Sequence, residues 1–207
     1  QGHPPIHNFL GIPLRFDGQA VGMIAVGNRE GGYGQEQIEL LAPFATVLGT
    51  MIRARQLEEQ RALAEAALLR EATHDSLTGL GNRKLFFSMA DSLFKQAIRY
   101  EQHVALAVMD VDFFKSVNDR YGHQAGDQVL RIFAATLSDA VRSSDVHARV
   151  GGEEFAVLLA QTNETNAFDV LERFRKALEN TRITLKDGTE LSITVSIGYC
   201  DFFDGLH

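Results

Sequence analysis

The order of apolar and polar positions divides the chain into three regions. Two apolar runs at residues 9–13 and 21–26 flank an Asp-Gly pair, which is the pattern of a β-hairpin. A glycine-rich loop follows at residues 29–34. From residue 35 to residue 73, good helix formers predominate. Beyond residue 73, short apolar runs alternate with helical patterns, which predicts a mixed α/β region.

The long helix predicted in the middle region carries a narrow apolar stripe. Its members recur at close to heptad spacing for about three repeats, with Arg61 interrupting the row. They are Val47, Met51, Ala54, Leu57, Ala64 and Leu68. Because so narrow a stripe needs a partner, we expect residues 47–73 to form a parallel coiled coil that supports a homodimer. A single helix that folds back on its own domains is the alternative.

The third region predicts a split-βαβ fold of the α/β (α+β) class, with a mainly antiparallel, palm-like sheet. The expected helices are 83–100, 113–121, 128–142 and 164–180, with a loop at residues 122–127. The expected strands are a buried one at 104–109, a hairpin of 146–150 with 155–159, and a closing pair of 182–187 with 190–199. The order is β-α-α-β-β-α-β.

Composition narrows the function classes. The chain has 207 residues, is 45% apolar and contains 14 Phe, so it is long enough for one or two domains with real cores. A net charge of −7 without a basic run argues against binding to nucleic acid. The single cysteine, Cys200, excludes an internal disulfide. No signal peptide or membrane segment is visible, so we expect a cytoplasmic protein.

Carboxylates occur at two positions where a chain usually turns. Glu153 and Glu154 follow two glycines at the predicted hairpin turn, and Asp110 and Asp112 follow the buried strand. Such oxygen ligands suit Mg²⁺, which shares its shell with substrate phosphates, and the N-terminal amides of the next helix could receive a phosphate. The alternatives are a solvated hairpin tip and helix caps made by the two aspartates.

Five separated motifs together resemble the GGDEF family of diguanylate cyclases across residues 73–203. They are Asp75-x-Leu77-Thr78-Gly79-Leu80-x-Asn82-Arg83, Asp110-Val111-Asp112-Phe113-Phe114-Lys115 with Asn118-Asp119, Tyr121-Gly122-His123-x-x-Gly126-Asp127, Gly151-Gly152-Glu153-Glu154-Phe155 and Thr194-Val195-Ser196-Ile197-Gly198. The first hairpin resembles the closing half of a GAF sensory domain. We therefore expect a partial GAF-like domain at 1–46, a coiled-coil linker at 47–73 and a GGDEF domain at 74–207.

The resemblance implies an enzyme that condenses two GTP into cyclic di-GMP and two pyrophosphates, with Mg²⁺ or alternatively Mn²⁺. It assigns the metal to Asp110, the Val111 carbonyl and Glu153, and the catalytic work to Glu153 with Glu154 nearby. Phosphate contacts fall to the Phe113 and Phe114 amides and to Lys115. Asn118 and Asp127 would read guanine, because an Asp accepts from N1–H and the 2-amino group together. His123 would join that pocket.

The resemblance also implies regulation by the product. Arg142 and Asp145 match an R-x-x-D inhibitory site for cyclic di-GMP, and Arg173 supplies a second Arg. A surface helix end is the alternative for this stretch. The family further implies a C-terminal helix with a Lys and an Arg on the phosphates, so we expect the site within these 207 residues to have less positive charge. Two other functions stay open: a catalytically silent module that binds GTP or cyclic di-GMP, and a different nucleotidyl cyclase or polymerase palm.

Overall fold

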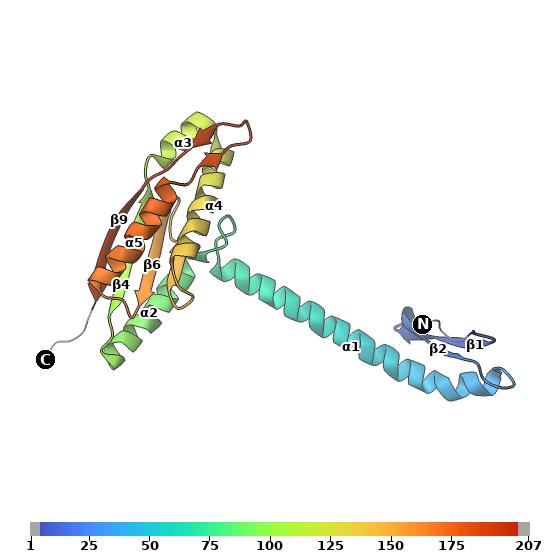
Figure 1. Ribbon diagram of the computed structural model, residues 1–207. Helices are drawn as coiled ribbons and strands as arrows, with labels where there is room; N and C mark the ends of the chain where they lie inside the picture. Colours follow the sequence, from blue (N-terminus) through green and yellow to red (C-terminus); the bar gives the residue numbers. More distant parts are fainter. Residues whose placement is uncertain (1–4, 203–207) are drawn as a thin grey trace. The chain divides into compact units, whose positions relative to one another are not determined.

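The computed structural model describes residues 5–202, which divide into two compact units at Leu68 and Leu69 (Figure 1). In the first unit, β1 (Phe9–Phe16) and β2 (Gln19–Gly27) pair as the predicted antiparallel hairpin. The helix α1 (Gln35–Thr73) then begins and ends where the sequence predicted. None of the helices between residues 5 and 202 combines the length and apolar character needed to cross a bilayer.

The start of α1 packs on β1, whereas its later turns are exposed. Ile12 and Leu14 of β1 are buried with Ala45 of α1. Gly49 allows this close approach, because a Cβ there would lie 2.6 Å from the Arg15 carbonyl oxygen. Farther along, the stripe residue Leu57 is 46% exposed. The apolar stripe therefore remains available to a partner.

The second unit contains a five-stranded sheet in the order β3-β5-β6-β4-β9. Its strands are β3 (Gly81–Asn82), β4 (Val104–Val111), β5 (Val146–Arg149), β6 (Glu154–Ala160) and β9 (Val195–Phe202), and a separate pair is formed by β7 (Ile183–Thr184) and β8 (Glu190–Leu191). Its helices are α2 (Arg83–Tyr100), α3 (Phe114–Tyr121), α4 (His123–Ala140) and α5 (Glu164–Glu179). Only the β3–β5 pairing in this sheet is parallel, so the predicted mainly antiparallel α/β fold is confirmed.

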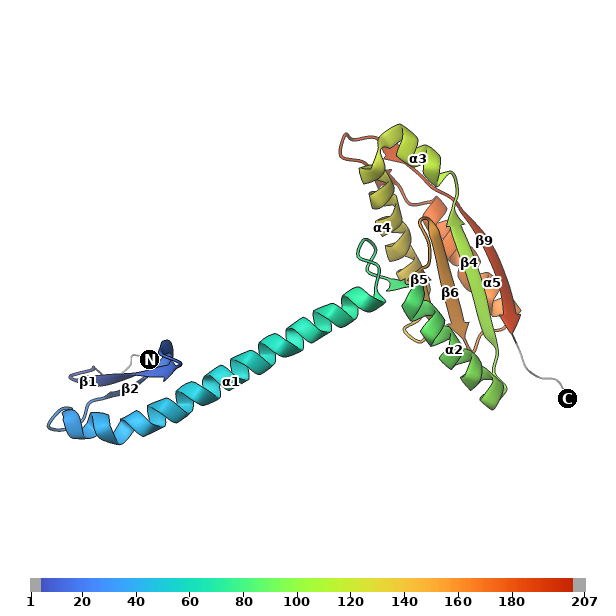
Figure 2. The same cartoon turned by 180° about the vertical axis from the view of Figure 1, so that it is seen from behind.

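Helices cover both faces of the sheet (Figures 1 and 2). On one face, α4 and α5 bury the larger core, in which the Phe133 ring stacks on Phe155 at 4.2 Å and meets Phe174 edge-on. On the other face, Phe86 of α2 packs over Leu158 of β6. This second face is also the one that Asp110 and Glu154 share, because side chains alternate along β4 and β6.

Four predicted elements differ from the structure, one of them the strand expected at 182–187, of which only β7 (Ile183–Thr184) forms. Residues 122–127 were expected as a loop, but α4 begins at His123, because Gly122 at φ +81° redirects the chain into a new helix at once. That helix ends at Ala140 and not at residue 142, since Val141 is extended. The expected strand 190–199 is two strands: β8 pairs with β7, whereas β9 joins β4 in the main sheet.

Candidate functional site

The predicted metal residues meet at one edge of the sheet. Asp110 and Glu154 are register partners on β4 and β6. The turn of residues 150–153 lies beside the end of β4, where the Val111 N–H donates to the Glu153 carbonyl oxygen at 3.3 Å. The structure therefore brings together Asp110, Val111, Glu153 and Glu154, which are distant in sequence. Their roles as metal ligands and catalytic groups stay predictions.

The electrostatics of this edge favour a cation. The Asp110 carboxyl reaches the surface, but neighbouring atoms restrict its hydration, and the charges of Glu154 and Asp112 add repulsion, so its pKa lies above the ordinary value. Within residues 5–202, no three His, Cys, Asp or Glu side chains form a ready chelate. An ion held here would complete its shell with a backbone carbonyl and phosphate oxygens, as Mg²⁺ commonly does. The oxygen-only donor set fits that group.

Gly151 leaves room for the Glu154 side chain at the turn. The Glu154 carboxylate lies over Gly151, where an added Cβ would overlap it. The N–H groups of Val150 and Gly151 both donate to the Glu154 carbonyl oxygen, at 2.9 and 3.3 Å. At Gly152, by contrast, an added Cβ would meet no atom within 4 Å. The turn is therefore closed on its inner side and open to a ligand at Gly152.

The corner between β4 and α3 has the geometry of an anion site. Phe113 adopts φ +56° and ψ +25°, and Phe114 after it begins α3. A left-handed residue followed by a helical one points successive N–H groups into one concavity, and the first N–H groups of a helix lack intrahelical partners. The corner thus presents backbone donors where the sequence placed the phosphates. Lys115 is exposed beside them.

Asp112 does not cap α3, which was the alternative role considered for it. No side chain caps this helix. The two carboxylate oxygens of Asp112 instead accept from the hydroxyl groups of Thr194 and Ser196, each at 2.6 Å. Asp112 N–H also donates to the Thr194 carbonyl oxygen at 3.1 Å. These bonds tie the end of β4 to the start of β9 and hold the corner between β4 and α3 in place.

The predicted guanine readers lie where α3 packs against α4. The Asn118 amide lies directly against Gly126, where any Cβ would overlap it. Asp127 follows Gly126 and is half-buried, with Arg131 at 3.9 Å from its carboxylate. His123, four residues before Asp127, shares that helix face and is exposed. Asn118, His123 and Asp127 are therefore gathered at one corner, because Gly126 lets the two helices approach.

Arg149 is a site residue that sequence reasoning missed. Its guanidinium donates from Nη1 to both Asp75 carboxylate oxygens at 3.2 Å, and from Nε and Nη2 to the Gly152 carbonyl oxygen at 3.1 and 2.7 Å. Asp75 also accepts from the Thr78 N–H and hydroxyl. Arg149 thus connects the segment after α1 to the Glu-bearing turn. Its position two residues before Gly151 was the only signal in the sequence.

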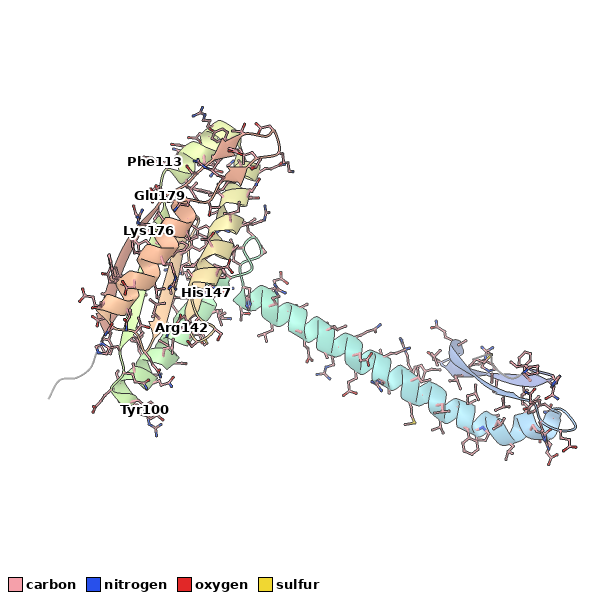
Figure 3. All side chains as sticks on the ribbon, in the orientation of Figure 1. Tyr100, Phe113, Arg142, His147, Lys176 and Glu179 are labelled. Carbon is pink, nitrogen blue, oxygen red and sulfur yellow. The ribbon has the colours of Figure 1, made fainter. Side chains whose placement is uncertain are left out.

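The predicted inhibitory residues gather at the C-terminal end of α4. Arg173 of α5 donates to the Ala140 carbonyl oxygen at 2.7 Å, and Arg142 two residues later is exposed (Figure 3). The Asp145 carboxylate is engaged by backbone, accepting from the Arg142 and Ala160 N–H groups at 2.8 and 3.1 Å. Since α4 has 18 residues and spans roughly 27 Å, this cluster lies at the opposite end of that helix from His123.

Two family comparisons match the two parts of the chain. Residues 72–206 match the family described as "Diguanylate cyclase, GGDEF domain". Residues 1–53 match the family described as "GAF domain". The first match covers the whole sheet and every candidate site residue discussed above. The second covers the β1–β2 hairpin and the start of α1.

Individual proteins give the same result. The response regulator PleD of Caulobacter vibrioides is 42% identical over 128 residues, which are 61% of this chain and 28% of PleD. Diguanylate cyclase A of Treponema denticola is 32% identical over 200 residues, covering 92% of this chain and 50% of that protein. The crystal structure of the coiled coil and GGDEF domain of DgcB from Caulobacter crescentus, in complex with c-di-GMP, is 32% identical, with a TM-score of 0.65 and coverage of 81% and 85%. The chain thus spans half or less of these two curated relatives.

Proposed function

Because this chain belongs to the GGDEF family of diguanylate cyclases, we propose that it joins two GTP molecules into cyclic di-GMP and releases two pyrophosphates. One observation carries the proposal: the carboxylates of Asp110, Glu153 and Glu154 lie at the same sheet edge as the N–H donors of Phe113 and Phe114. Phosphoryl transfer needs mainly positioning and charge stabilisation, and this edge offers groups for both.

The residues of this edge have distinct tasks in the proposed reaction. The amides of Phe113 and Phe114, with the ammonium of Lys115, hold the phosphates of one GTP. The 3′-oxygen of the other GTP attacks the α-phosphorus, and its proton passes to Glu153. The bond from the α-phosphorus to the bridging oxygen breaks, and pyrophosphate leaves. A second attack in the opposite direction closes the ring.

A divalent ion fits this site and would be held by Asp110, the Val111 carbonyl and Glu153, with Glu154 adjacent. When bound, Mg²⁺ or Mn²⁺ would neutralise phosphate charge and make the attacking hydroxyl more acidic. The raised pKa of Asp110, caused by restricted hydration and by the charges of Glu154 and Asp112, supports this assignment. A cation at this point would relieve that repulsion.

Guanine selection falls to Asn118 and Asp127, with His123 beside them. The Asp127 carboxylate would accept from N1–H and the 2-amino group of guanine, a donor pair that adenine lacks. A site built around such a pair discriminates strongly, because a base without the donors leaves a polar group unpaired. Gly126 supports this selection by allowing Asn118 to approach α4.

The reaction joins two substrates, so two domains must face each other, and the exposed stripe of α1 supplies a surface for pairing two copies. The product would then bind at Arg142, Asp145 and Arg173 and slow the enzyme by restraining the two domains. An Arg can donate to guanine O6 and N7 together, and Arg142 is exposed for that purpose. Asp145 would meet the opposite guanine edge after releasing part of its backbone contacts.

The deciding experiment is incubation of the chain, and of any longer protein that contains it, with GTP and Mg²⁺. Mass spectrometry should identify cyclic di-GMP and pyrophosphate in a ratio of one to two, and ATP should give no cyclic dinucleotide. GTP binding without any product would contradict the proposal and leave a binding module. A cyclic mononucleotide as product would instead indicate a different nucleotidyl cyclase.

A further inference from the structure

Phe113 combines two unfavourable features at the phosphate corner. Phe113 is 82% exposed, more than any other large apolar residue between residues 5 and 202. Its backbone is left-handed, at φ +56°. For a bulky L-residue this conformation is a genuine outlier, because Cβ crowds the following carbonyl. Figure 3 labels Phe113 at the corner between β4 and α3.

Neither feature is explained by folding within this unit. Glycine would adopt the same backbone conformation without strain, and any polar residue would be better hydrated at this exposure. The left-handed backbone has a purpose, since it turns the N–H groups of Phe113 and Phe114 toward an anion. The aromatic ring serves no purpose in this unit, because it packs against none of the hydrophobic cores described above. A complex would give the ring a contact that this unit does not supply.

The proposed reaction identifies that complex. If a phosphate of one GTP lies on the Phe113 amide, the attacking 3′-oxygen of the other GTP must come to about 3–3.5 Å from the α-phosphorus. The ring belongs to the residue whose own N–H holds the phosphate. A second copy that brings its nucleotide this close therefore approaches a residue whose aromatic ring is exposed.

We propose that the Phe113 ring of one copy contacts the GTP bound by the second copy, packing against its ribose and guanine. This inference rests on the proposed function and deepens it: each half-site lacks this contact until the other copy closes on it. The contact is apolar and aromatic, so it orients the incoming sugar without competing for the metal or the phosphates. Asp110 and Glu153 supply the charge, and Phe113 supplies the docking surface.

Turnover and binding measurements separate this role from a structural one. Phe113→Asn keeps a residue that tolerates the left-handed conformation but removes the ring, and Phe113→Tyr keeps the ring. Stacking on a base contributes about 5- to 150-fold, so we expect Phe113→Asn to lower turnover about tenfold or more while the Kd for GTP stays within about twofold. Phe113→Tyr should lose less turnover than Phe113→Asn, because it keeps the ring. Phe168→Ala, which removes another ring that is 52% exposed, should leave turnover unchanged.

A direct readout uses the fact that the chain contains no tryptophan. In Phe113→Trp, the introduced indole should report solvent exposure in the free protein. The analogue 3′-deoxy-GTP cannot react, because it lacks the attacking hydroxyl. Adding it together with Mg²⁺ should shift the emission of the indole to the blue, and the shift should grow with protein concentration. The introduced indole of Phe168→Trp should not respond.

Two results would overturn the contact between copies. An emission shift independent of protein concentration means that the ring covers its own nucleotide. An indole that stays exposed at high concentration, together with full turnover in Phe113→Asn, means that the ring has no role. Because the fluorescence measurement needs no chemistry, it is separable from failure of the proposed function, which shows as absence of cyclic di-GMP from wild type.

Discussion

Replacing Arg149 tests whether its hydrogen bonds to Asp75 and Gly152 fix the position of the Glu-bearing turn at residues 150–153. Its guanidinium joins both Asp75 oxygens to the Gly152 carbonyl, and the two side chains are only 16% and 22% exposed. Arg149→Lys keeps the charge but cannot donate to both partners at once, because an ammonium lacks the planar fork of the guanidinium. The Gly152 carbonyl and the Glu153 residue after it then lose their support.

The expected loss of stability follows from this burial. An exposed ion pair contributes about 0–1 kcal/mol, and breaking a fully buried one costs about 3–5 kcal/mol. A pair exposed by about a fifth lies between these limits, so we expect about 2 kcal/mol, or a fall in Tm of roughly 6–10 °C. Turnover should fall more than stability suggests, because a displacement of about 1 Å at a catalytic group costs about 100-fold.

The assay compares Arg149→Lys with wild type for cyclic di-GMP formation, thermal unfolding and cyclic di-GMP binding. Arg175→Lys is the matched control, because Arg175 pairs with Glu172 and Glu179 on α5, away from the turn. It should lose little turnover. Product affinity should be unchanged in Arg149→Lys, since the hydrogen bonds of Arg149 go to Asp75 and Gly152 and not to the inhibitory cluster. If Arg149→Lys turns over at the wild-type rate below its Tm, the turn is rigid without Arg149 and our reasoning is wrong.

Four further predictions follow from the same geometry. Glu153→Gln should abolish cyclic di-GMP formation with unchanged circular dichroism, because it removes a charged oxygen without changing shape. Arg142→Ala should weaken cyclic di-GMP binding in calorimetry and relieve inhibition that is not competitive with GTP; equal affinity in both proteins would refute the site. Replacing Leu57 and Leu68 with Asp should lower activity steeply at dilute protein, and sedimentation of a fully active monomer would contradict the coiled coil. Mn²⁺ affinity, followed by electron spin resonance, should fall as the pH decreases through the raised pKa of Asp110, because protonation removes the charged ligand, and Asp110→Asn should flatten that profile.

Elements with local causes were predictable from the sequence. The helix α2 spans residues 83–100 as predicted, because Asn82 caps it by accepting from the Leu85 N–H at 3.0 Å and its apolar positions repeat with the helical period. The helix α1 matched for a similar reason, since its residues favour helix from Gln35 onward. Clustering of Asp110 with the glutamates was implied by the resemblance, and the register of β4 and β6 produces it.

The loop predicted at residues 122–127 and the strand predicted at 190–199 were wrong, because tertiary contacts and not local composition determine their structure. Gly126 resembles a turn residue, yet it lies inside α4, where the Asn118 side chain fills the space beside it. Local propensity favours a loop for Gly, His and Asp. Tertiary packing can override that preference and keep a glycine inside a helix. Similarly, residues 190–199 form one β-rich stretch, but it divides into β8, which pairs with β7, and β9, which joins β4. The hydrogen bond from the Thr194 hydroxyl to Asp112 lies between the two strands and fixes the chain at the end of β4.

Arg149, which connects Asp75 to the Glu-bearing turn, was the site residue hardest to predict from the sequence. Arg149 and Asp75 are 74 positions apart, and no local pattern marks them as partners. Burial of Asp75 opposes its ionisation, but hydrogen bonds from Thr78 and Arg149 outweigh this and lower its pKa below the ordinary value. A carboxylate with a depressed pKa stabilises the fold above its unfolded pKa, and that contribution is lost as the pH falls through the folded pKa. At neutral pH the pair is therefore fully charged. Asp75 lies two residues beyond the end of α1, and two side chains, its own carboxylate and the Arg149 guanidinium, connect it to the Gly152 carbonyl.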